Sequence, residues 1–177
     1  RVYAIGDVAE GHPRFTHTAG YHAGLVVRNA LLRLPVTART DHIPAVTYTD
    51  PEVAQVGLTA EDARARHGTS VEVHAVPLSG NDRAQAARRT EGLGVLVAGP
   101  RGRILGAAIA APGAGDLIQP WALALSKGLK LGDISGHVAA YPTLGEISKR
   151  MAGAYFSPRL FGSPLVKRAV RLLARLG

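Results

Sequence analysis

The sequence predicts an α+β fold, in which an antiparallel sheet packs against helices, preceded by a separate strand and helix. Short apolar segments of strand length follow one another between residues 46 and 110, and segments with helical spacing follow one another from residue 116 onward. Consecutive strands followed by consecutive helices are typical of an antiparallel sheet covered by helices. A polar break at residues 37–42 separates this part from the N-terminal strand and helix.

The N-terminal part is predicted to be a short strand followed by a long helix. Val2–Ile5 is an apolar run that leads directly into Gly6 and Asp7. Apolar residues then recur at helical spacing over residues 16–34, and Pro35 ends the pattern. Because a strand of this buried type needs neighbours to pair with, we expect residues 1–38 to be part of a larger α/β unit.

Five strands and one short helix are predicted between residues 43 and 110. Asp50-Pro51-Glu52 is a turn sequence that joins the first two strands, and the last two strands form a hairpin over residues 100–103. Thr59 is suited to cap the helix over residues 60–67, with Asp62 in the position of a capping box. The predicted strands are residues 46–49, 53–58, 71–76, 93–98 and 104–110.

Three helical segments complete the chain. The first two are predicted over residues 116–127 and 143–155. The third is a basic segment that begins with Ser163 and Pro164, which suit the cap and the first position of a helix. The sequence is therefore divided into residues 1–38, an α+β domain over residues 43–160 and a C-terminal basic amphipathic helix over residues 161–177.

Composition excludes several classes of protein. The 177 residues are 46% hydrophobic, enough for one ordinary domain with further elements. There is no cysteine, which excludes disulfides, thiolate catalysis and cysteine zinc sites within this chain. No apolar run approaches the roughly 20 residues of a membrane span, and the N-terminus lacks the layout of a signal peptide. We therefore expect a soluble cytoplasmic protein.

The net charge of +8 is concentrated near the C-terminus. Residues 147–177 contain only basic residues among their charged side chains and carry +7, which leaves +1 for the rest. In the last helix these basic residues alternate with an apolar stripe of Val166, Ala169, Val170, Leu173 and Leu176. We interpret it first as a helix docked on its own protein, with peripheral attachment to an anionic membrane as the alternative. Nucleic-acid binding is disfavoured, because aromatic residues are not interleaved with the basic ones.

Five motifs occur in an order that resembles one family of flavoenzymes. They are YAIGDV (residues 3–8), FTHTA (15–19), TYTDPEVAQVGLT (47–59), GRILGAAIAAPGAGDLIQPWALAL (102–125) and YPTLGE (141–146). The chain is similar in this respect to the FAD-dependent pyridine nucleotide-disulfide oxidoreductases, which include dihydrolipoamide dehydrogenase, glutathione reductase and mercuric reductase. The resemblance implies that residues 1–38 end an FAD-binding domain and that residues 43–160 form the dimerisation domain. The partners it implies are a second copy of the chain and upstream FAD and NAD(P) domains, with NAD(P)H as co-substrate.

The resemblance assigns five residues to FAD binding, namely Gly6, Asp7, Thr16, His17 and Ala19. A glycine lets a ligand approach the backbone, and a carboxylate accepts hydrogen bonds from hydroxyl groups; in the family this aspartate binds the ribityl chain of FAD. The other three residues open a helix whose positive end would face the pyrimidine edge of the flavin. Without the resemblance, the first pair is an ordinary turn and the threonine a helix cap.

The resemblance also draws attention to Tyr141 and Glu146. Family members that reduce a disulfide usually carry His-Pro-Thr followed three residues later by glutamate; the histidine is acid and base toward the partner subunit's thiols, and the glutamate orients it. Here the sequence is Tyr141-Pro142-Thr143 with Glu146. A phenol with a pKa of about 10 is a poor base at neutral pH, but it can donate a proton or a hydrogen bond. There are two alternatives. Tyr141 packs at the dimer interface without a catalytic role, or His137 replaces the missing base.

The remaining polar residues give weaker signals. Asp50 and Glu52 are paired acids, but a solvated turn is the preferred interpretation. The seven histidines form no helical pair at the spacing that a metal site uses, so no metal site is expected. Mercuric reductases also place a tyrosine near position 141, but they end in a cysteine pair that this chain lacks.

Two hypotheses for the function remain. In the first, the chain is the C-terminal part of a homodimeric flavoenzyme that passes electrons from NAD(P)H to a disulfide or a related acceptor, with Tyr141 and Glu146 contributed across the dimer. In the second, it is a non-catalytic dimerisation module whose basic tail docks on a membrane or another subunit. Because a Gly-x-Gly-x-x-Gly loop and redox cysteines are absent, the 177 residues alone are expected to bind FAD weakly and to be inactive.

Overall fold

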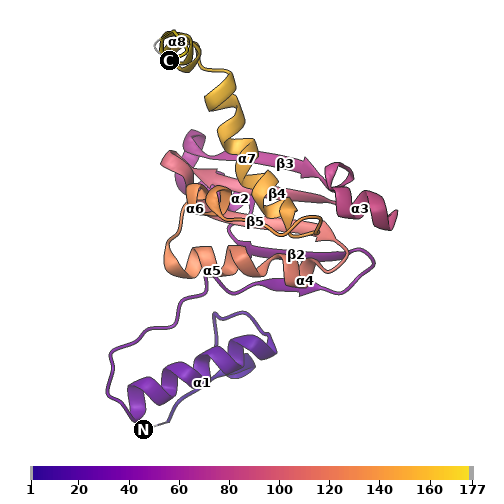
Figure 1. Cartoon of the computed structure of the whole chain (residues 1–177). Helices are drawn as coiled ribbons and strands as arrows, with labels where there is room; N and C mark the ends of the chain where they lie inside the picture. Colours follow the sequence, from indigo (N-terminus) through magenta and orange to yellow (C-terminus); the bar gives the residue numbers. More distant parts are fainter. Residues whose placement is uncertain (1, 176–177) are drawn as a thin grey trace.

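A computed structural model describes residues 2–175 and contains one five-stranded antiparallel sheet with the strand order β1-β2-β5-β4-β3. The sheet and its helices confirm the predicted α+β class (Figure 1). Each of the five strands predicted between residues 43 and 110 is present, with ends that differ by at most two residues. The strands are β1 (Ala45–Thr47), β2 (Glu52–Gly57), β3 (Glu72–Pro77), β4 (Leu93–Gly99) and β5 (Arg103–Ala111).

Helices cover one face of the sheet. Figure 1 shows them in front of the strands. They are α4 (Ala114–Leu117), α5 (Gln119–Lys127), α6 (Leu131–Gly136) and α7 (Glu146–Phe161). The main core lies between these helices and the sheet, where Trp121, Leu96, Ile109 and Met151 are fully buried. The helix predicted over residues 116–127 is in fact α4 and α5, divided at Ile118.

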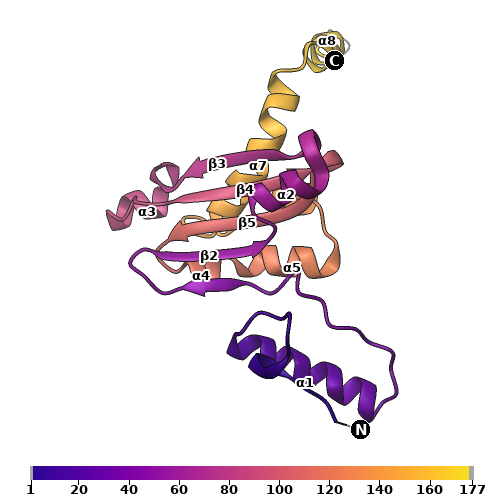
Figure 2. The same cartoon turned by 180° about the vertical axis from the view of Figure 1, so that it is seen from behind.

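The opposite face of the sheet is covered only at one end, by α2 (Ala60–His67) (Figure 2). The bounds of α2 are those predicted, because its capping signals are local: the Thr59 side chain accepts a hydrogen bond from the backbone N–H of Asp62 at 3.0 Å. Elsewhere on this face two rows of side chains cross β2, β5 and β4. One row is Val53, Ala110 and Leu93, and the next is Gln55, Ala108 and Val95. We call these six residues the open sheet face.

The N-terminal part differs from its prediction. Residues 2–5 are extended but form no strand, because no neighbouring strand in residues 2–175 is available to pair with them. A 3-10 turn (η1, Gly6–Val8) then leads to α1 (Thr16–Ala30). The helix ends four residues before the predicted end, and Arg33 takes a left-handed conformation with φ 55° ahead of Pro35. Figure 1 shows α1 beside the sheet domain, joined to it by an extended segment.

Two short helices were missed, namely α6 and α3 (Asp82–Ala87). Each has six residues, too few to repeat an apolar spacing. The helix predicted over residues 143–155 is α7, which begins at Glu146 and continues past Pro158 to Phe161. Its Tyr155 hydroxyl accepts a hydrogen bond from the N–H of Gly102 at 2.9 Å and so attaches α7 to the β4–β5 turn.

The basic segment forms the last helix, α8 (Pro164–Leu173), capped as predicted by Ser163. Every residue of α8 is exposed, so the expectation that it docks on its own protein is wrong for the residues described. The cause is α7, which carries α8 away from the sheet (Figure 1). Leu176, which was included in the apolar stripe, and the end of the 161–177 segment lie outside the described residues.

Candidate functional site

The residues singled out in the sequence form two groups in the structure. Gly6, Asp7, Thr16, His17 and Ala19 lie in η1 and the first turn of α1. Glu146 is the first residue of α7, and Tyr141 lies in the turn ahead of that helix. The chain therefore brings the members of each group together, but it keeps the two groups on different parts of the molecule.

Gly6 holds η1 against α1. It is buried and has a φ of 64°, a conformation that side chains disfavour. A methyl group at this position would lie 2.9 Å from Cβ of Ala19, which explains why both residues are small. The N–H of Gly6 donates to Nδ1 of His22 at 3.1 Å and fixes the turn to the helix.

The beginning of α1 leaves polar groups available next to this turn. Asp7, Thr16 and His17 are exposed. Phe15 occupies the cap position and offers no side-chain hydrogen bond, so Thr16 is not the cap. The first backbone N–H groups of an α-helix lack partners within the helix and carry its positive end. This arrangement can hold an electron-rich ligand, with the Asp7 carboxylate available to hydroxyl groups.

His17 connects α1 with the sheet domain. Its Nε2–H donates to the carbonyl oxygen of Pro44 at 2.8 Å, and its ring stacks on Phe15 with centroids 5.0 Å apart. A carbonyl only accepts, so Nε2 carries the proton of this hydrogen bond. A hollow of about 350 Å³ lies beside His17 and is bordered by Tyr48 and Glu52.

His22 is a buried residue of this region that the sequence did not single out. Its Nδ1 accepts from Gly6, so the proton lies on Nε2, which has no hydrogen-bond partner among the residues that the structure describes. Its ring meets that of His12 edge to face at 4.6 Å. Within residues 2–175 no group of three or more His, Cys, Asp or Glu side chains is placed to hold a metal ion.

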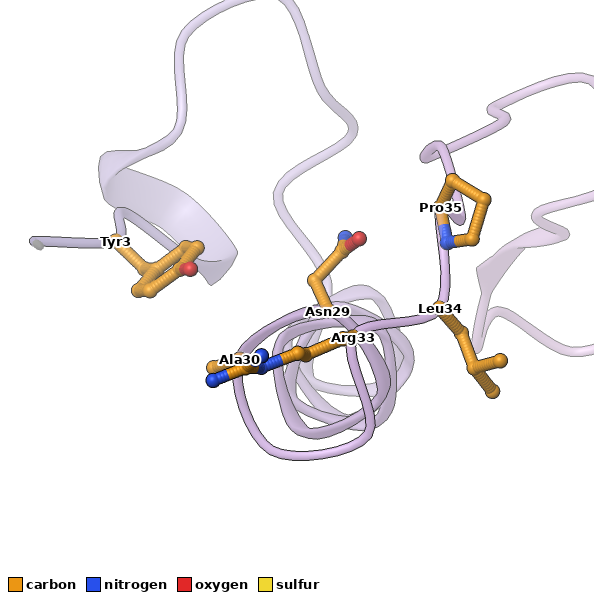
Figure 3. A pocket seen from close by; sticks show the side chains of 6 residues that line it. All are labelled: Tyr3, Asn29, Ala30, Arg33, Leu34 and Pro35. Atoms are coloured by element: carbon orange, nitrogen blue, oxygen red, sulfur yellow. The ribbon is translucent and has the colours of Figure 1, made fainter.

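A hollow of about 750 Å³ lies at the other end of α1 (Figure 3). Tyr3 faces it from the N-terminal segment, and the Arg33 side chain crosses the end of the helix. It is lined by Tyr3, Asn29, Ala30, Arg33, Leu34 and Pro35. This lining offers no carboxylate and no imidazole for acid–base chemistry.

Tyr141 is 70% exposed, and its hydroxyl donates a hydrogen bond to Oδ2 of Asp82 at 3.1 Å. This hydrogen bond and the negative charge of Asp82 raise the pKa of Tyr141 above its ordinary value of about 10, because they disfavour the phenolate. Tyr141 is therefore a phenol at neutral pH. It can donate a hydrogen bond, and it is an even poorer base than an isolated tyrosine.

Glu146 has a different partner from the one predicted for it. Its Oε2 accepts a hydrogen bond from the N–H of Thr143 at 3.3 Å and closes the turn ahead of α7. The same turn is attached to α3 by Asn81, whose side-chain amide donates to the Thr143 carbonyl at 3.0 Å and accepts from the N–H of Ala84. Glu146 thus orients the backbone beside Tyr141, while Asp82 orients the hydroxyl.

Asn81 and Asp82 are the residues of this site that sequence reasoning missed. Asn81 is almost completely buried, although it is polar, and it caps α3. An Asn-Asp pair ahead of a helix is a recognisable capping signal, but contacts with residues about 60 positions away have no local signature. His137, the alternative base, donates from Nδ1 to the carbonyl of Ile134 at 2.6 Å.

Replacing Asp82 with asparagine is expected to lower the pKa of Tyr141 toward about 10. The substitution removes the negative charge that disfavours the phenolate, so Tyr141 should ionise at a lower pH than in the unmodified chain. The measurement is the tyrosinate absorbance as the pH is raised, with the signal of Tyr141 isolated by subtracting the Tyr141→Phe titration. Asp116→Asn, which neutralises an exposed carboxylate on α4, should leave the curve unchanged; an unchanged curve for Asp82→Asn contradicts the assignment.

The fold and the site together define a class of protein. Within residues 2–175 the sheet is entirely antiparallel, so it lacks the parallel βαβ unit that binds dinucleotides, and its polar site lies at the start of a helix that covers the sheet. Residues 43–152 match the family described as pyridine nucleotide-disulphide oxidoreductase, dimerisation domain. The match covers more than half of the chain, and the chain belongs to this family.

Known proteins that resemble the chain are redox enzymes. Mercuric reductase from Bacillus cereus is 39% identical over 147 residues, which are 82% of this chain and 23% of that protein. Dihydrolipoyl dehydrogenase from Bacillus subtilis (strain 168) is 36% identical over 152 residues, which are 85% of this chain and 32% of that protein. The chain thus spans about a quarter to a third of the length of these relatives.

Solved structures support the fold. The crystal structure of LpdA from Mycobacterium tuberculosis superimposes with a TM-score of 0.77 at 24% identity, covering 85% of this chain and 33% of that one. The HOCl-induced flavoprotein disulfide reductase RclA from Escherichia coli gives 0.73, also at 24% identity, with 85% and 35% coverage. At this level of identity the comparisons establish the architecture alone.

Proposed function

We propose that the chain is the C-terminal dimerisation portion of a homodimeric, FAD-dependent NAD(P)H oxidoreductase that acts on a disulfide or a related acceptor. The observation that carries the proposal is the family match over residues 43–152, preceded in the same chain by the Gly6-Asp7 turn and the open start of α1. Residues 1–38 would complete an FAD-binding domain whose other elements, with the NAD(P) domain, lie upstream.

The exposed apolar surface of the N-terminal part supports this view. Val2 is fully exposed, and Leu31 and Leu32 are 74% and 62% exposed. Tyr3 and Leu34, which border the hollow of Figure 3, are 43% and 47% exposed. Several large apolar side chains exposed on one short segment favour a region that packs against other protein. The missing part of an FAD-binding domain is the partner that the family would supply.

The residues near η1 fit the FAD that the family implies. The Asp7 carboxylate is exposed, and Gly6, where a Cβ would meet Ala19, lets η1 lie close against the first turn of α1. We assign Asp7 to the ribityl hydroxyls and the first N–H groups of α1, at Thr16 and His17, to the pyrimidine edge of the flavin. FAD would supply the acceptor for a hydride from NAD(P)H. The part of this chain is to bind and orient it.

The open sheet face is suited to the contact between two copies. Val53 and Leu93 are 46% and 41% exposed, although their strands, β2 and β4, both lie inside the sheet on either side of β5. Ala110 of β5, which lies between them, is also apolar, and helix α2 covers the other end of this face (Figure 2). Homodimer interfaces are typically apolar and self-complementary. We assign the open sheet face to the interface between subunits.

Tyr141 and Glu146 would serve the partner subunit's redox centre. Tyr141 is exposed and kept protonated by Asp82, to which its one hydroxyl hydrogen is donated. Its role would be to transfer this hydrogen bond from Asp82 to a group that gains electrons. Glu146 holds the turn that presents it. This chain contains no cysteine, so any redox thiols would lie in the upstream part. A thiol reaction would then use a proton acceptor other than Tyr141.

The proposal is tested by the mass of the 177-residue chain at micromolar concentration. A single chain has a mass of 18.5 kDa, and light scattering is expected to give twice this value. Val53→Asp should shift the mass to that of one chain, because it would bury a carboxylate at the interface. The matched control Ala65→Asp, at an exposed position of α2, should keep the dimer. A monomer for the unmodified chain contradicts the proposal.

A further inference from the structure

We propose that α8 binds the surface of an anionic lipid bilayer and lies in the plane of that surface. Helix α8 lies outside residues 43–152, which match the family, so the proposed lipid contact is independent of the redox function. In the part of the chain that the structure describes, no helix is long and apolar enough to cross a membrane, so the proposed contact is superficial.

The side chains of α8 are sorted by type around its axis. At about 100° per residue, the apolar residues fall within an arc about 160° wide, and the basic residues fall within an arc of about 100° on the opposite side. The apolar residues are Leu165, Val166, Ala169, Val170, Leu172 and Leu173, and the basic ones are Lys167, Arg168, Arg171 and Arg175, the last of which follows the helix. A helix with this separation has one face suited to hydrocarbon and one suited to polar groups.

Nothing in the described chain covers the apolar arc. Leu165 is 79% exposed, and Leu172 and Leu173 are 61% and 66% exposed. Figure 1 shows α8 at the far end of α7, away from the sheet and from α1. Phe161, at the joint between the two helices, is also 71% exposed. A bilayer would remove this aliphatic surface from water without changing the rest of the fold.

The charge of the tail selects an anionic surface. From residue 147 onward the chain contains only basic residues among its charged side chains, and none of the ion pairs within residues 2–175 involves α8. Lys167 and Arg168 flank the apolar arc, one on each side. The aliphatic part of each side chain can therefore lie along the edge of the hydrocarbon while its charged end reaches the head groups. Each such residue adds to the attraction of anionic lipid.

A second copy of α8 is a less suitable occupant than lipid. It would bring three more positive charges to the same place, and a fourth from Arg175 just past the helix, and the chain as a whole already carries +8. An acidic protein groove would match the charge, but it would need acidic residues along both edges of an apolar arc that spans nearly half of the helix. An anionic bilayer provides negative charge beside an apolar layer over its whole surface, so it is the occupant that matches α8 most simply.

The test measures co-sedimentation of the complete 177-residue chain with vesicles. One set contains phosphatidylcholine alone, and the other contains about a quarter phosphatidylserine. The chain is expected to bind the second set and to remain in solution with the first, and added salt should weaken the binding. Failure to bind the anionic vesicles, or equal binding to both sets, overturns the proposal.

Two variants with equal changes in charge sharpen the test. Replacing the four basic residues Lys167, Arg168, Arg171 and Arg175 with glutamine is expected to weaken binding by about a hundredfold or more. Replacing four exposed arginines elsewhere, namely Arg28, Arg64, Arg66 and Arg83, with glutamine should leave binding close to that of the unmodified chain. Equal loss in both variants, or loss in neither, overturns the proposal.

A third variant tests the apolar arc. Leu172→Ser with Leu173→Ser keeps all charges and should also reduce vesicle binding. Both residues are exposed, so the fold should persist, and the fluorescence of the buried Trp121 reports whether it does. If these serine substitutions lower the mass of a self-associated chain and leave vesicle binding unaffected, α8 is a protein interface and the proposal is wrong.

Discussion

Replacing Trp121 with alanine is expected to lower the free energy of unfolding by about 3–5 kcal/mol. Trp121 is completely buried and is among the largest side chains of the main core. Its truncation leaves a cavity under the sheet that a close-packed interior cannot close. It also removes the hydrogen bond from its Nε1–H to Oγ of Ser148, 3.0 Å long, and leaves that buried hydroxyl without this donor.

The measurement is urea unfolding followed by circular dichroism, at one protein concentration because dimerisation contributes to stability. Leu123→Ala is the matched control, because Leu123 lies on the same helix and is 57% exposed. This substitution should lower the free energy of unfolding by less than about 1 kcal/mol. Equal effects of the two substitutions would contradict the placement of Trp121 at the centre of the core.

Under the proposed function, replacing Asp7 with alanine is expected to weaken FAD binding by the full-length protein about 10- to 100-fold. A hydrogen bond to a charged group contributes about 1.5–3 kcal/mol, and each 1.4 kcal/mol is a factor of ten in affinity. Asp7 is exposed at the end of η1, so its loss should leave the fold unchanged. The effect therefore reports on ligand binding rather than on stability.

The measurement is the dissociation constant of FAD, obtained by adding the cofactor back to the protein after its removal. Glu10→Ala is the control, because Glu10 is an exposed carboxylate three residues further along the same loop and no role in FAD binding is assigned to it. If the affinity of Asp7→Ala for FAD is unchanged, Asp7 does not contact FAD, although it lies in the motif YAIGDV.

The strands and α2 could be predicted because their signals are local. Continuous aliphatic runs bounded by turn residues specify β4 and β5, and the Thr59 cap specifies the start of α2. Short α3 and α6 carry no repeat of apolar spacing and could not be found in this way. The Val2–Ile5 strand was wrong for a different reason: strand propensity is satisfied only where another strand provides hydrogen bonds.

The sequence predicted two residues of the candidate site but not the hydrogen-bond partners that hold them. The order of motifs led to Tyr141 and Glu146, but the partner of the Tyr141 hydroxyl is Asp82, 59 residues away in the sequence. Asn81, which fixes the turn from the other side, caps a helix that was itself missed. Long-range pairs of this kind arise from the packing of α3 beside the start of α7, and a single sequence does not encode them as a pattern. The roles of the residues in both groups stay predictions.

Helix α7 sets the distance between the turn that carries Tyr141 and helix α8. It has 16 residues, so it is about 24 Å long, with the turn that carries Tyr141 at its first end and α8 just past its last. Its buried residues Ile147, Met151 and Tyr155 fix it to the sheet along much of this length. If α8 lies on a bilayer, α7 determines how far the Tyr141 side chain lies above the lipid surface and how it is oriented toward that surface. An acceptor dissolved in the membrane and one dissolved in water would then approach the site from different directions.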